Sequence, residues 1–237
     1  LTNYQKNNLY IFSEYIAKTI NKIDKNNLKK NFKFFLDDAD PNLENSFAFS
    51  PPRGKNNFAV IDPIMIRTNF YQAKMGSLKV KKVDYQNKED LCYWRGALTG
   101  IPSLKVFDIK NKDLYIKKIL DPDTLGRMKL CFLNKKIERC DFKLTRAGQW
   151  LWSSEIIERL KEYNFYSNEE PFEWNYKFKY LIDIDGNSNS WPGLFMKLCS
   201  GSCILKVDSK YNYYQWFYKY SKPWIHFVPI NSDLSDL

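Results

Sequence analysis

The residues best suited to chemistry lie in the loop Gly186–Gly193, which leads into an expected helix over Trp191–Ser200. Ser190 can cap that helix, and Pro192 is acceptable in its first turn. The start of a helix presents unpaired backbone N–H groups and a partial positive charge, which suit a phosphate group. The loop therefore predicts a phosphate-binding site, with an ordinary capped core helix as the plainer alternative.

Two apolar runs flank this loop and helix and are expected to hold them in place. Tyr180–Ile184 stops at Asp185-Gly186, and the β-branched run Cys203–Val207 follows the helix. The order strand, loop, helix, strand is that of a βαβ unit, so the sequence predicts an α/β fold.

Arg95 is a second candidate, because it follows an expected strand over Leu91–Trp94 and precedes Gly96. Arginine suits bidentate phosphate contact, and a small residue lets the backbone approach a ligand closely. The alternative is a surface arginine in a salt bridge between domains.

Three other features indicate no metal or catalytic site. Asp183–Asp185 has the spacing of a DxD metal motif, but so short a pattern is common by chance. The single histidine, His226, lies in an apolar run and is predicted to be packed and hydrogen-bonded. The five cysteines form no CxxC pair, which indicates reduced thiols in a cytosolic compartment and no zinc site.

Composition defines the broad class. Of the 237 residues, 44% are hydrophobic, which is enough for one or two hydrophobic cores. The sequence contains no run of eighteen apolar residues, so it predicts no membrane-spanning helix. The amino terminus lacks a charged-then-apolar signal pattern, so we expect a cytoplasmic protein. The net charge of +10 attracts nucleic acid, acidic lipid head groups, phosphorylated glycans or nucleotide sugars alike.

Two domains are expected, 1–87 and 88–237. The connection between them is placed in the lysine-rich stretch Lys74–Asp90, which shows no sustained periodicity. Before it, Phe32–Leu36 and Phe58–Ile61 are short strand candidates that end at aspartate-containing turns.

Taken together, these motifs resemble glycosyltransferase family 90, which contains bacterial LpsA-type lipopolysaccharide glycosyltransferases and animal protein O-glucosyltransferases. The likeness extends from about residue 88 to the end. The matching segments are Tyr93–Gly100 (YWRGALTG), the KYL-I-DG run at Lys179–Gly186, Ser190-Trp191, SGS at Ser200–Ser202, and the KPW-H-VP and SDLSDL runs within Lys222–Leu237.

The resemblance implies a GT-B-type α/β fold of two Rossmann-like lobes with a cleft between them. It implies an inverting, metal-independent hexosyltransferase that needs no cofactor beyond its UDP-sugar donor. The donor would bind the C-terminal lobe, and the N-terminal lobe would face the acceptor, a hydroxyl of a lipopolysaccharide core or related glycan. Such an enzyme would be cytoplasmic, with peripheral contact to the anionic inner membrane surface and no nucleic-acid partner.

The resemblance also implies that the catalytic base is an aspartate from the N-terminal lobe. Asp62 is the nearest match, since it ends an apolar strand and would project at the carboxyl edge of a sheet. Equally, Asp62 could simply open a turn before Pro63. Asp37, Asp38 and Asp40 are the other candidates.

For the donor, the resemblance places Arg95, Gly96 and Thr99 at the nucleotide end, with Arg127 in a helix nearby. One departure is Pro192, at or beside a position where many relatives have an arginine that grips the diphosphate; Arg95, Arg127 or Lys197 could replace that arginine. The expected nucleotide-binding residues are Arg95, Gly96, Thr99, Arg127, Gly186, Asn187, Ser190, Trp191 and Lys197.

Two alternatives remain open. A pI of 9.2 and 17% aromatic residues are compatible with a nucleic-acid-binding protein, although no binding motif supports it. The missing arginine, and an end at Leu237 where relatives continue into a closing helix, are compatible with a catalytically inactive relative.

Overall fold

The computed structural model divides the chain into two compact units. The first comprises Leu1–Val80 with Tyr211–Tyr220, and the second comprises Lys81–Lys210 with Ser221–Leu237. The residues that the structure describes are 10, 13–14, 33–35, 40–54, 56–69, 83–100, 108–148 and 150–237.

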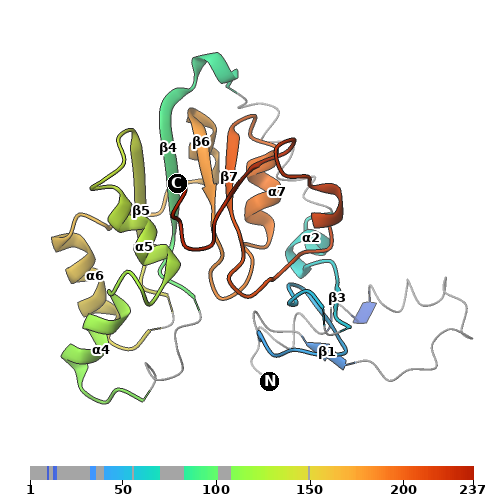
Figure 1. Ribbon diagram of the computed structural model, residues 1–237, viewed down its shortest axis with the longest axis horizontal. Helices are drawn as coiled ribbons and strands as arrows, with labels where there is room; N and C mark the ends of the chain where they lie inside the picture. The colour runs from blue at the N-terminus through green and yellow to red at the C-terminus, as the bar shows by residue number, and fades with distance from the viewer. Residues whose placement is uncertain are drawn as a thin grey trace, which may run out of the picture. The chain divides into compact units, whose positions relative to one another are not determined.

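The second unit is built on one five-stranded, entirely parallel sheet (Figure 1). Its strand order is β5-β4-β6-β7-β8. Counted from the first strand of the sheet, this is the order 2-1-3-4-5 of a doubly wound fold, so the unit is a Rossmann-like lobe. The strands are β4 (Glu89–Ala97), β5 (Cys140–Arg146), β6 (Phe178–Asp183), β7 (Cys203–Val207) and β8 (Val228–Ile230).

Helices complete this lobe. Three of them follow β4 or β5 and gather near β5 in Figure 1, whereas α7 lies against β6 and β7. None of the helices in the described parts of the chain is long and apolar enough to cross a membrane. The helices that the structure describes in this lobe are α4 (Lys112–Ile119), α5 (Gly126–Leu133), α6 (Ser153–Glu162) and α7 (Pro192–Leu198), with the short 3-10 turns η2 (Tyr85–Asn87) and η4 (Phe172–Lys177).

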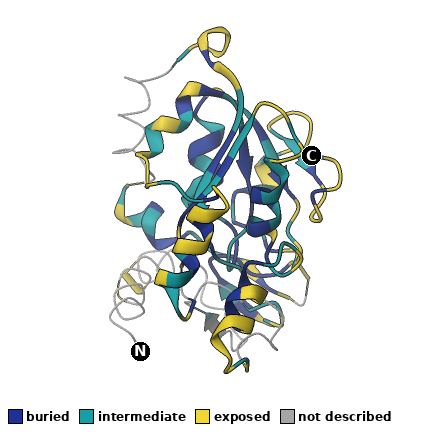
Figure 2. Cartoon of the chain, turned by 90° about the vertical axis from the view of Figure 1, so that its left-hand side faces the viewer, coloured by how far each residue is buried: buried dark blue, intermediate teal, exposed yellow. Residues whose placement is uncertain are grey.

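Both faces of the sheet are covered, as a parallel sheet requires. Neighbouring residues of β4 point to opposite faces, yet Tyr93 and Trp94 are both buried. Tyr93 stacks on Phe178 with ring centroids 4.1 Å apart, while Trp94 joins the main apolar core. Figure 2 shows the same pattern, with buried residues in the strands and exposed ones on the outer turns of the helices.

The first unit is much less regular in the parts that the structure describes. It holds a parallel sheet of three short strands, β1 (Lys33–Phe35), β2 (Ser46–Ala48) and β3 (Phe58–Ala59), and the helix α2 (Pro63–Arg67). The aromatic segment Tyr211–Tyr220, which includes the 3-10 turn η5 (Tyr218–Tyr220), returns to this unit.

That return is held by specific contacts. Tyr214 donates its hydroxyl to the carbonyl of Asn57 at 2.8 Å, Arg53 donates its backbone N–H to Asn212 at 2.9 Å, and the Arg53 guanidinium lies 4.9 Å from the Tyr214 ring. The segment therefore belongs to a unit that is far from it in sequence.

The expectation of two Rossmann-like lobes needs correction. The α/β class and one Rossmann-like lobe are confirmed, but the described residues of the first unit do not form a second one. Strands of two or three residues and one five-residue helix offer too little surface for a doubly wound sheet.

A core truncation should test the packing of the Rossmann-like lobe. Leu144 of β5 is fully buried in the main core, so Leu144→Ala should lower the free energy of unfolding by about 2–5 kcal/mol. Leu151→Ala removes the same atoms from a side chain that is 57% exposed and should change stability by less than about 0.5 kcal/mol. Urea unfolding followed by tryptophan fluorescence measures both, and equal losses would contradict the packing described.

Candidate functional site

The candidate site lies where β4 and β6 separate. Their register ends at Tyr93 and Leu181, while β4 continues beside β5 to Ala97. The strand order reverses at this place, and in open α/β sheets ligands bind beyond the carboxyl ends of the strands at such a reversal.

A cavity of about 260 Å³ opens at this edge. Its lining comes from the ends of β4 and β5, from α5, η4 and α7, from the segment between α6 and η4, and from the loop after β6. The lining residues are Trp94, Arg95, Gly96, Ala97, Arg127, Thr145, Arg146, Glu169, Glu170, Phe172, Asn175, Ile184, Ser190, Gly193 and Lys197.

Arg127 bridges the gap between the two strands. Its Nε donates to the carbonyl of Asp185 (2.9 Å), and its Nη2 donates to that of Ile184 (3.1 Å). Its Nη1 donates to the carbonyl of Ala97 (3.0 Å) and to Thr99 Oγ1 (2.8 Å). The guanidinium thereby ties the end of β4 to the loop after β6, and these bonds engage all three of its nitrogens.

Gly186 and Asn187 continue this connection. A Cβ atom on Gly186 would lie 2.4 Å from Thr99 Oγ1 and 2.9 Å from Arg127 Nη2, so only glycine fits there without displacing the bridge. Asn187 Oδ1 accepts the backbone N–H of Gly100 at 3.0 Å. The two residues hold the loops after β4 and β6 together.

Arg95 is tied to the neighbouring strand. Its Nη2 lies 2.5 Å from Asp141 Oδ2, and its Nη1 donates at 2.9 Å to the carbonyls of Trp94 and Asp141. The guanidinium also lies 4.3 Å from the Tyr93 ring. Its buried Nε has no hydrogen-bond partner among the described residues. The salt bridge is thus formed within one lobe.

Asp183, the last residue of β6, organises the opposite wall of the cavity. Ser190 Oγ donates to Asp183 Oδ1 at 2.6 Å, and Lys197 Nζ lies 3.0 Å from the same oxygen. Lys206 Nζ is 4.0 Å from Oδ2. Burial alone favours the neutral carboxyl of Asp183, but the two lysines and the serine outweigh it, so the pKa of Asp183 is lowered.

The expected cap of the last helix needs correction. Helix α7 begins at Pro192, its N-cap is Trp191, and no side chain caps it. The Ser190 hydroxyl is directed to Asp183 instead, because a charge-assisted bond to a buried carboxylate is stronger than a bond to a backbone group.

Asp185 is in a different environment from Asp183. Its Oδ1 accepts from Asn189 Nδ2 at 2.9 Å, and burial raises the pKa of this carboxyl. Among the described residues, no group of three or more histidine, cysteine, aspartate or glutamate side chains is arranged to hold a metal ion.

The structure brings some of the nine expected nucleotide-binding residues together and leaves others outside the cavity. Those that line it are Arg95, Gly96, Arg127, Ser190 and Lys197. Those that do not are Thr99, Gly186, Asn187 and Trp191. The first three of these four connect the loops after β4 and β6, and the Trp191 indole is buried and donates to Ser188 Oγ at 3.3 Å.

Asp62 belongs to the first unit. It is the N-cap of α2, and its Oδ1 accepts the backbone N–H of Met65 at 2.9 Å. Of its alternatives, Asp40 accepts the N–H of Asn42 at 2.8 Å, while Asp37 and Asp38 lie outside the described residues. A catalytic role for Asp62 stays a prediction.

His226 is hydrogen-bonded, as expected, but it is not packed. Its Nδ1 accepts the backbone N–H of Lys222 at 2.9 Å, and the residue is exposed. The apolar run around it forms a tight turn whose Trp224 and Ile225 also face solvent, so the prediction of a packed side chain is wrong.

Several lining residues were not predicted from the sequence. Glu169, Glu170, Phe172 and Asn175 lie in and before η4, and Thr145 and Arg146 end β5. No motif marks these positions, and only the pairing of β4 with β5 brings the latter two to the cavity. The one signal in the sequence that could have found Thr145 and Arg146 is that they end a strand, since ligands bind at strand ends in such sheets.

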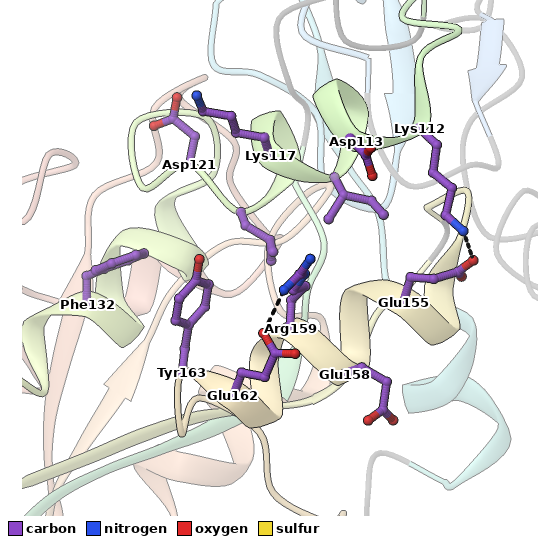
Figure 3. Close-up of a pocket in the computed structure, with 12 residues that line it drawn as sticks. Lys112, Asp113, Lys117, Asp121, Phe132, Glu155, Glu158, Arg159, Glu162 and Tyr163 are labelled. Atoms are coloured by element: carbon purple, nitrogen blue, oxygen red, sulfur yellow. Dashed lines mark hydrogen bonds and ion pairs between the residues drawn. The ribbon is translucent and has the colours of Figure 1, made fainter.

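A second cavity, of about 760 Å³, lies between α4, α5 and α6 (Figure 3). Five carboxylates and three cations line it. Figure 3 shows Glu155 next to Lys112 and Arg159 next to Glu162, and the Arg159–Glu162 hydrogen bond measures 2.9 Å. An acidic lining repels a diphosphate. Although this cavity is larger, we assign the candidate site to the smaller one at the strand ends.

The Arg127 bridge can be tested by a conservative substitution. A lysine has one nitrogen and cannot reach four acceptors, so Arg127→Lys should leave buried carbonyls unsatisfied and lower the free energy of unfolding by about 3 kcal/mol. Arg159→Lys, at an exposed ion pair on α6, is the matched control and should change stability by less than about 0.5 kcal/mol. Chemical denaturation compares them, and a neutral Arg127→Lys would contradict the bridging role.

The buried carboxylates should respond oppositely to neutralisation. Asp183→Asn should lower stability by about 3–5 kcal/mol at pH 7, because it leaves buried lysines without their anion. The folded pKa of Asp183 is lowered, so its contribution is present above about pH 4 and is lost as the pH falls through the folded pKa.

Asp185→Asn is the control for that measurement. Its folded pKa is raised, so ionisation of Asp185 opposes folding once the pH exceeds about 4, and removing the charge should leave stability at pH 7 unchanged or higher. Denaturation curves from about pH 2 to about pH 7 cover both effects. Equal losses in both variants would refute the assigned charge states.

Comparison with known proteins gives the family of the chain. Residues 63–237 match Glycosyl transferase family 90. The chain is 40% identical over 62 residues to protein O-glucosyltransferase 2 of Danio rerio and to protein O-glucosyltransferase 3 of Homo sapiens; the match covers 26% of this chain and 12% of each relative. It is 44% identical over 66 residues to "Uncharacterized protein 179R" of Invertebrate iridescent virus 6, covering 26% of this chain and 6% of that protein. Since the family match spans most of its length, the chain belongs to glycosyl transferase family 90.

Proposed function

We propose that this chain transfers a hexose from a UDP-sugar to an acceptor hydroxyl. The observation that carries the proposal is the cavity at the reversal of strand order, lined by the cations Arg95 and Lys197 in a member of a glycosyltransferase family. Departure of a nucleoside diphosphate develops negative charge, and fixed cations in a partly enclosed site stabilise that charge.

The contacts indicate which cations serve this role. Arg127 lines the cavity, but hydrogen bonds to the protein engage each of its nitrogens. Lys197 has three N–H groups, and its bond to Asp183 uses one of them. Arg95 has a buried Nε without a partner among the described residues. Lys197 and Arg95 are therefore our candidates to replace the arginine that many relatives have near Pro192.

The size of the cavity supports a phosphate-binding role. About 260 Å³ is slightly below the roughly 300–1,000 Å³ typical of small-molecule sites, so it suits the diphosphate with a part of the donor. Gly96 lines the same cavity. Its missing side chain leaves room for the indole of Trp94, which a Cβ atom would approach to 2.6 Å.

For the chemical step, we propose a single displacement with inversion and without a metal. The acceptor oxygen forms a bond to the anomeric carbon while the bond from that carbon to the diphosphate breaks. The acceptor proton passes to the base, for which Asp62 is our candidate, and UDP leaves with the electron pair. The sequence resemblance is the support for Asp62.

Two acceptor classes compete. A lipopolysaccharide core or related glycan was the expectation, and a net charge of +10 would favour contact of such a protein with an anionic membrane surface. Two matching relatives are named protein O-glucosyltransferases, which favours a protein hydroxyl instead. Radiolabelled sugar transfer to core oligosaccharide or to folded protein domains distinguishes the two.

The donor site can be tested by UDP binding and UDP-sugar hydrolysis. UDP should raise the melting temperature of the protein, and one member of a panel of UDP-sugars should be hydrolysed slowly. Lys197→Met should weaken UDP binding about tenfold, because it removes one charge-assisted contact. Lys161→Met, which removes an exposed lysine of α6, is the control and should bind UDP like the parent protein.

Other outcomes have distinct meanings. Salt-dependent binding of random oligonucleotides without any response to UDP would replace this proposal with a nucleic-acid-binding function. UDP binding without hydrolysis or transfer of any UDP-sugar would indicate a catalytically inactive relative. Unchanged UDP affinity in Lys197→Met would remove Lys197 from the donor site.

A further inference from the structure

A buried carboxylate lies directly behind the cavity without lining it. The side chain of Asp183 is fully buried, and the residue is absent from the cavity wall. Nevertheless its Oδ1 accepts from two side chains that do line the cavity, Ser190 at 2.6 Å and Lys197 at 3.0 Å. One oxygen atom thus fixes two groups of the candidate donor site.

The direction of these bonds gives the two groups different roles. The single hydroxyl proton of Ser190 is donated to Asp183, so the serine has only lone pairs left to offer. Lys197 retains two N–H groups beyond the one that faces Asp183. In this arrangement Lys197 is the donor available to an anion, and Ser190 forms the wall beside it.

The charge balance favours an anionic ligand. Lys197 and Lys206 both lie within 4.0 Å of Asp183, and Lys206 also acts on the buried carboxyl of Asp185. Of these two carboxyls only that of Asp183 has a lowered pKa, so it is the main anion that faces the two ammonium groups. Buried charge is costly unless it is balanced, and a bound phosphate next to Lys197 would supply further negative charge. Oδ2 of Asp183 has no hydrogen-bond partner among the described residues, so the carboxylate serves mainly through Oδ1 and its charge.

Gly193 preserves the space that this arrangement needs. A Cβ atom at this position would lie 2.9 Å from Ser190 Oγ and 3.9 Å from Lys197 Nζ. Any larger residue would push the serine hydroxyl away from Asp183. The absence of a side chain in the first turn of α7 is therefore part of the same arrangement.

We propose that Asp183 is a positioning residue of the donor site, which holds the Lys197 ammonium in place for the diphosphate and turns the Ser190 hydroxyl away from it. The inference rests on the proposed function, because it names the residue behind the donor-binding lysine. It assigns Asp183 no contact with the ligand.

A double-mutant cycle on UDP binding tests the proposal. Isothermal titration calorimetry measures the affinity for UDP. Asp183→Asn and Lys197→Met should each lower this affinity about tenfold. The double variant should also lower it about tenfold rather than a hundredfold, because both changes disable the same ammonium group. Ser190→Ala should lower the affinity for UDP less than about threefold, since the serine hydroxyl donates its proton to Asp183 and not to the ligand. The losses should be larger for UDP than for UMP, whose single phosphate makes fewer contacts; a purely structural defect would weaken both alike.

Two further variants keep the test decisive. Asp185→Asn alters a buried carboxylate two residues away that contacts neither Ser190 nor Lys197, and it should bind UDP within twofold of the parent. If Asp183→Asn does not fold, the double variant Asp183→Asn/Lys206→Met takes its place, because it removes one buried charge of each sign and keeps Lys197. Its affinity for UDP should be about tenfold lower than that of Lys206→Met alone.

The results separate the two levels of inference. If the parent protein binds neither UDP nor UMP, the proposed function fails. If the parent binds UDP but Asp183→Asn binds it equally well, or if the losses of Asp183→Asn and Lys197→Met multiply, the positioning role of Asp183 is wrong while the donor site stands.

Discussion

The candidate site depends on how the lobe closes the gap between β4 and β6. The register of these strands ends at Tyr93 and Leu181, and the backbone groups beyond it need other partners. Arg127 supplies them from α5 by binding three carbonyls and a threonine hydroxyl on the two sides. A planar guanidinium can do this because its donors point in fixed, diverging directions. These bonds connect the two sides of the gap, and a flexible lysine would not provide the same geometry.

Both candidate ligand-binding cations are already held by carboxylates of the same lobe. Arg95 pairs with Asp141 across two strands, and Lys197 pairs with Asp183 at the end of β6. The side chains of both cations are mostly buried, so each has little conformational freedom left to lose when a ligand arrives. Such preorganisation is what electrostatic catalysis requires of a leaving-group site. Through these two cations the cavity presents positive charge although residue 192 is a proline.

The two units differ in the contacts that stabilise them. The Rossmann-like lobe has a core to which strands β4 to β8 and helices α4, α5 and α6 contribute, including Trp94, Leu144, Ile156 and Ile230. In the first unit the described strands are short, and the aromatic segment Tyr211–Tyr220 adds contacts that its neighbours in sequence do not supply. Aromatic side chains suit this role, since each buries a large area, and tyrosine and tryptophan can also donate one hydrogen bond at their edge.

The sequence by itself determined the βαβ unit, because apolar runs such as Cys203–Val207 need burial on both faces and the intervening loop has few alternatives to a turn. It also indicated Arg95, Ser190 and Lys197, which line one cavity. Only the tertiary structure decided the direction of each side chain: Arg127 binds carbonyls, Ser190 binds Asp183 rather than capping α7, and His226 is exposed. Asp141 reaches Arg95 because β5 pairs with β4, and Glu169 and Glu170 reach the cavity on the segment between α6 and η4. Local patterns fix periodicity and turns, whereas the partner of a polar group depends on which distant segments the sheet brings beside it.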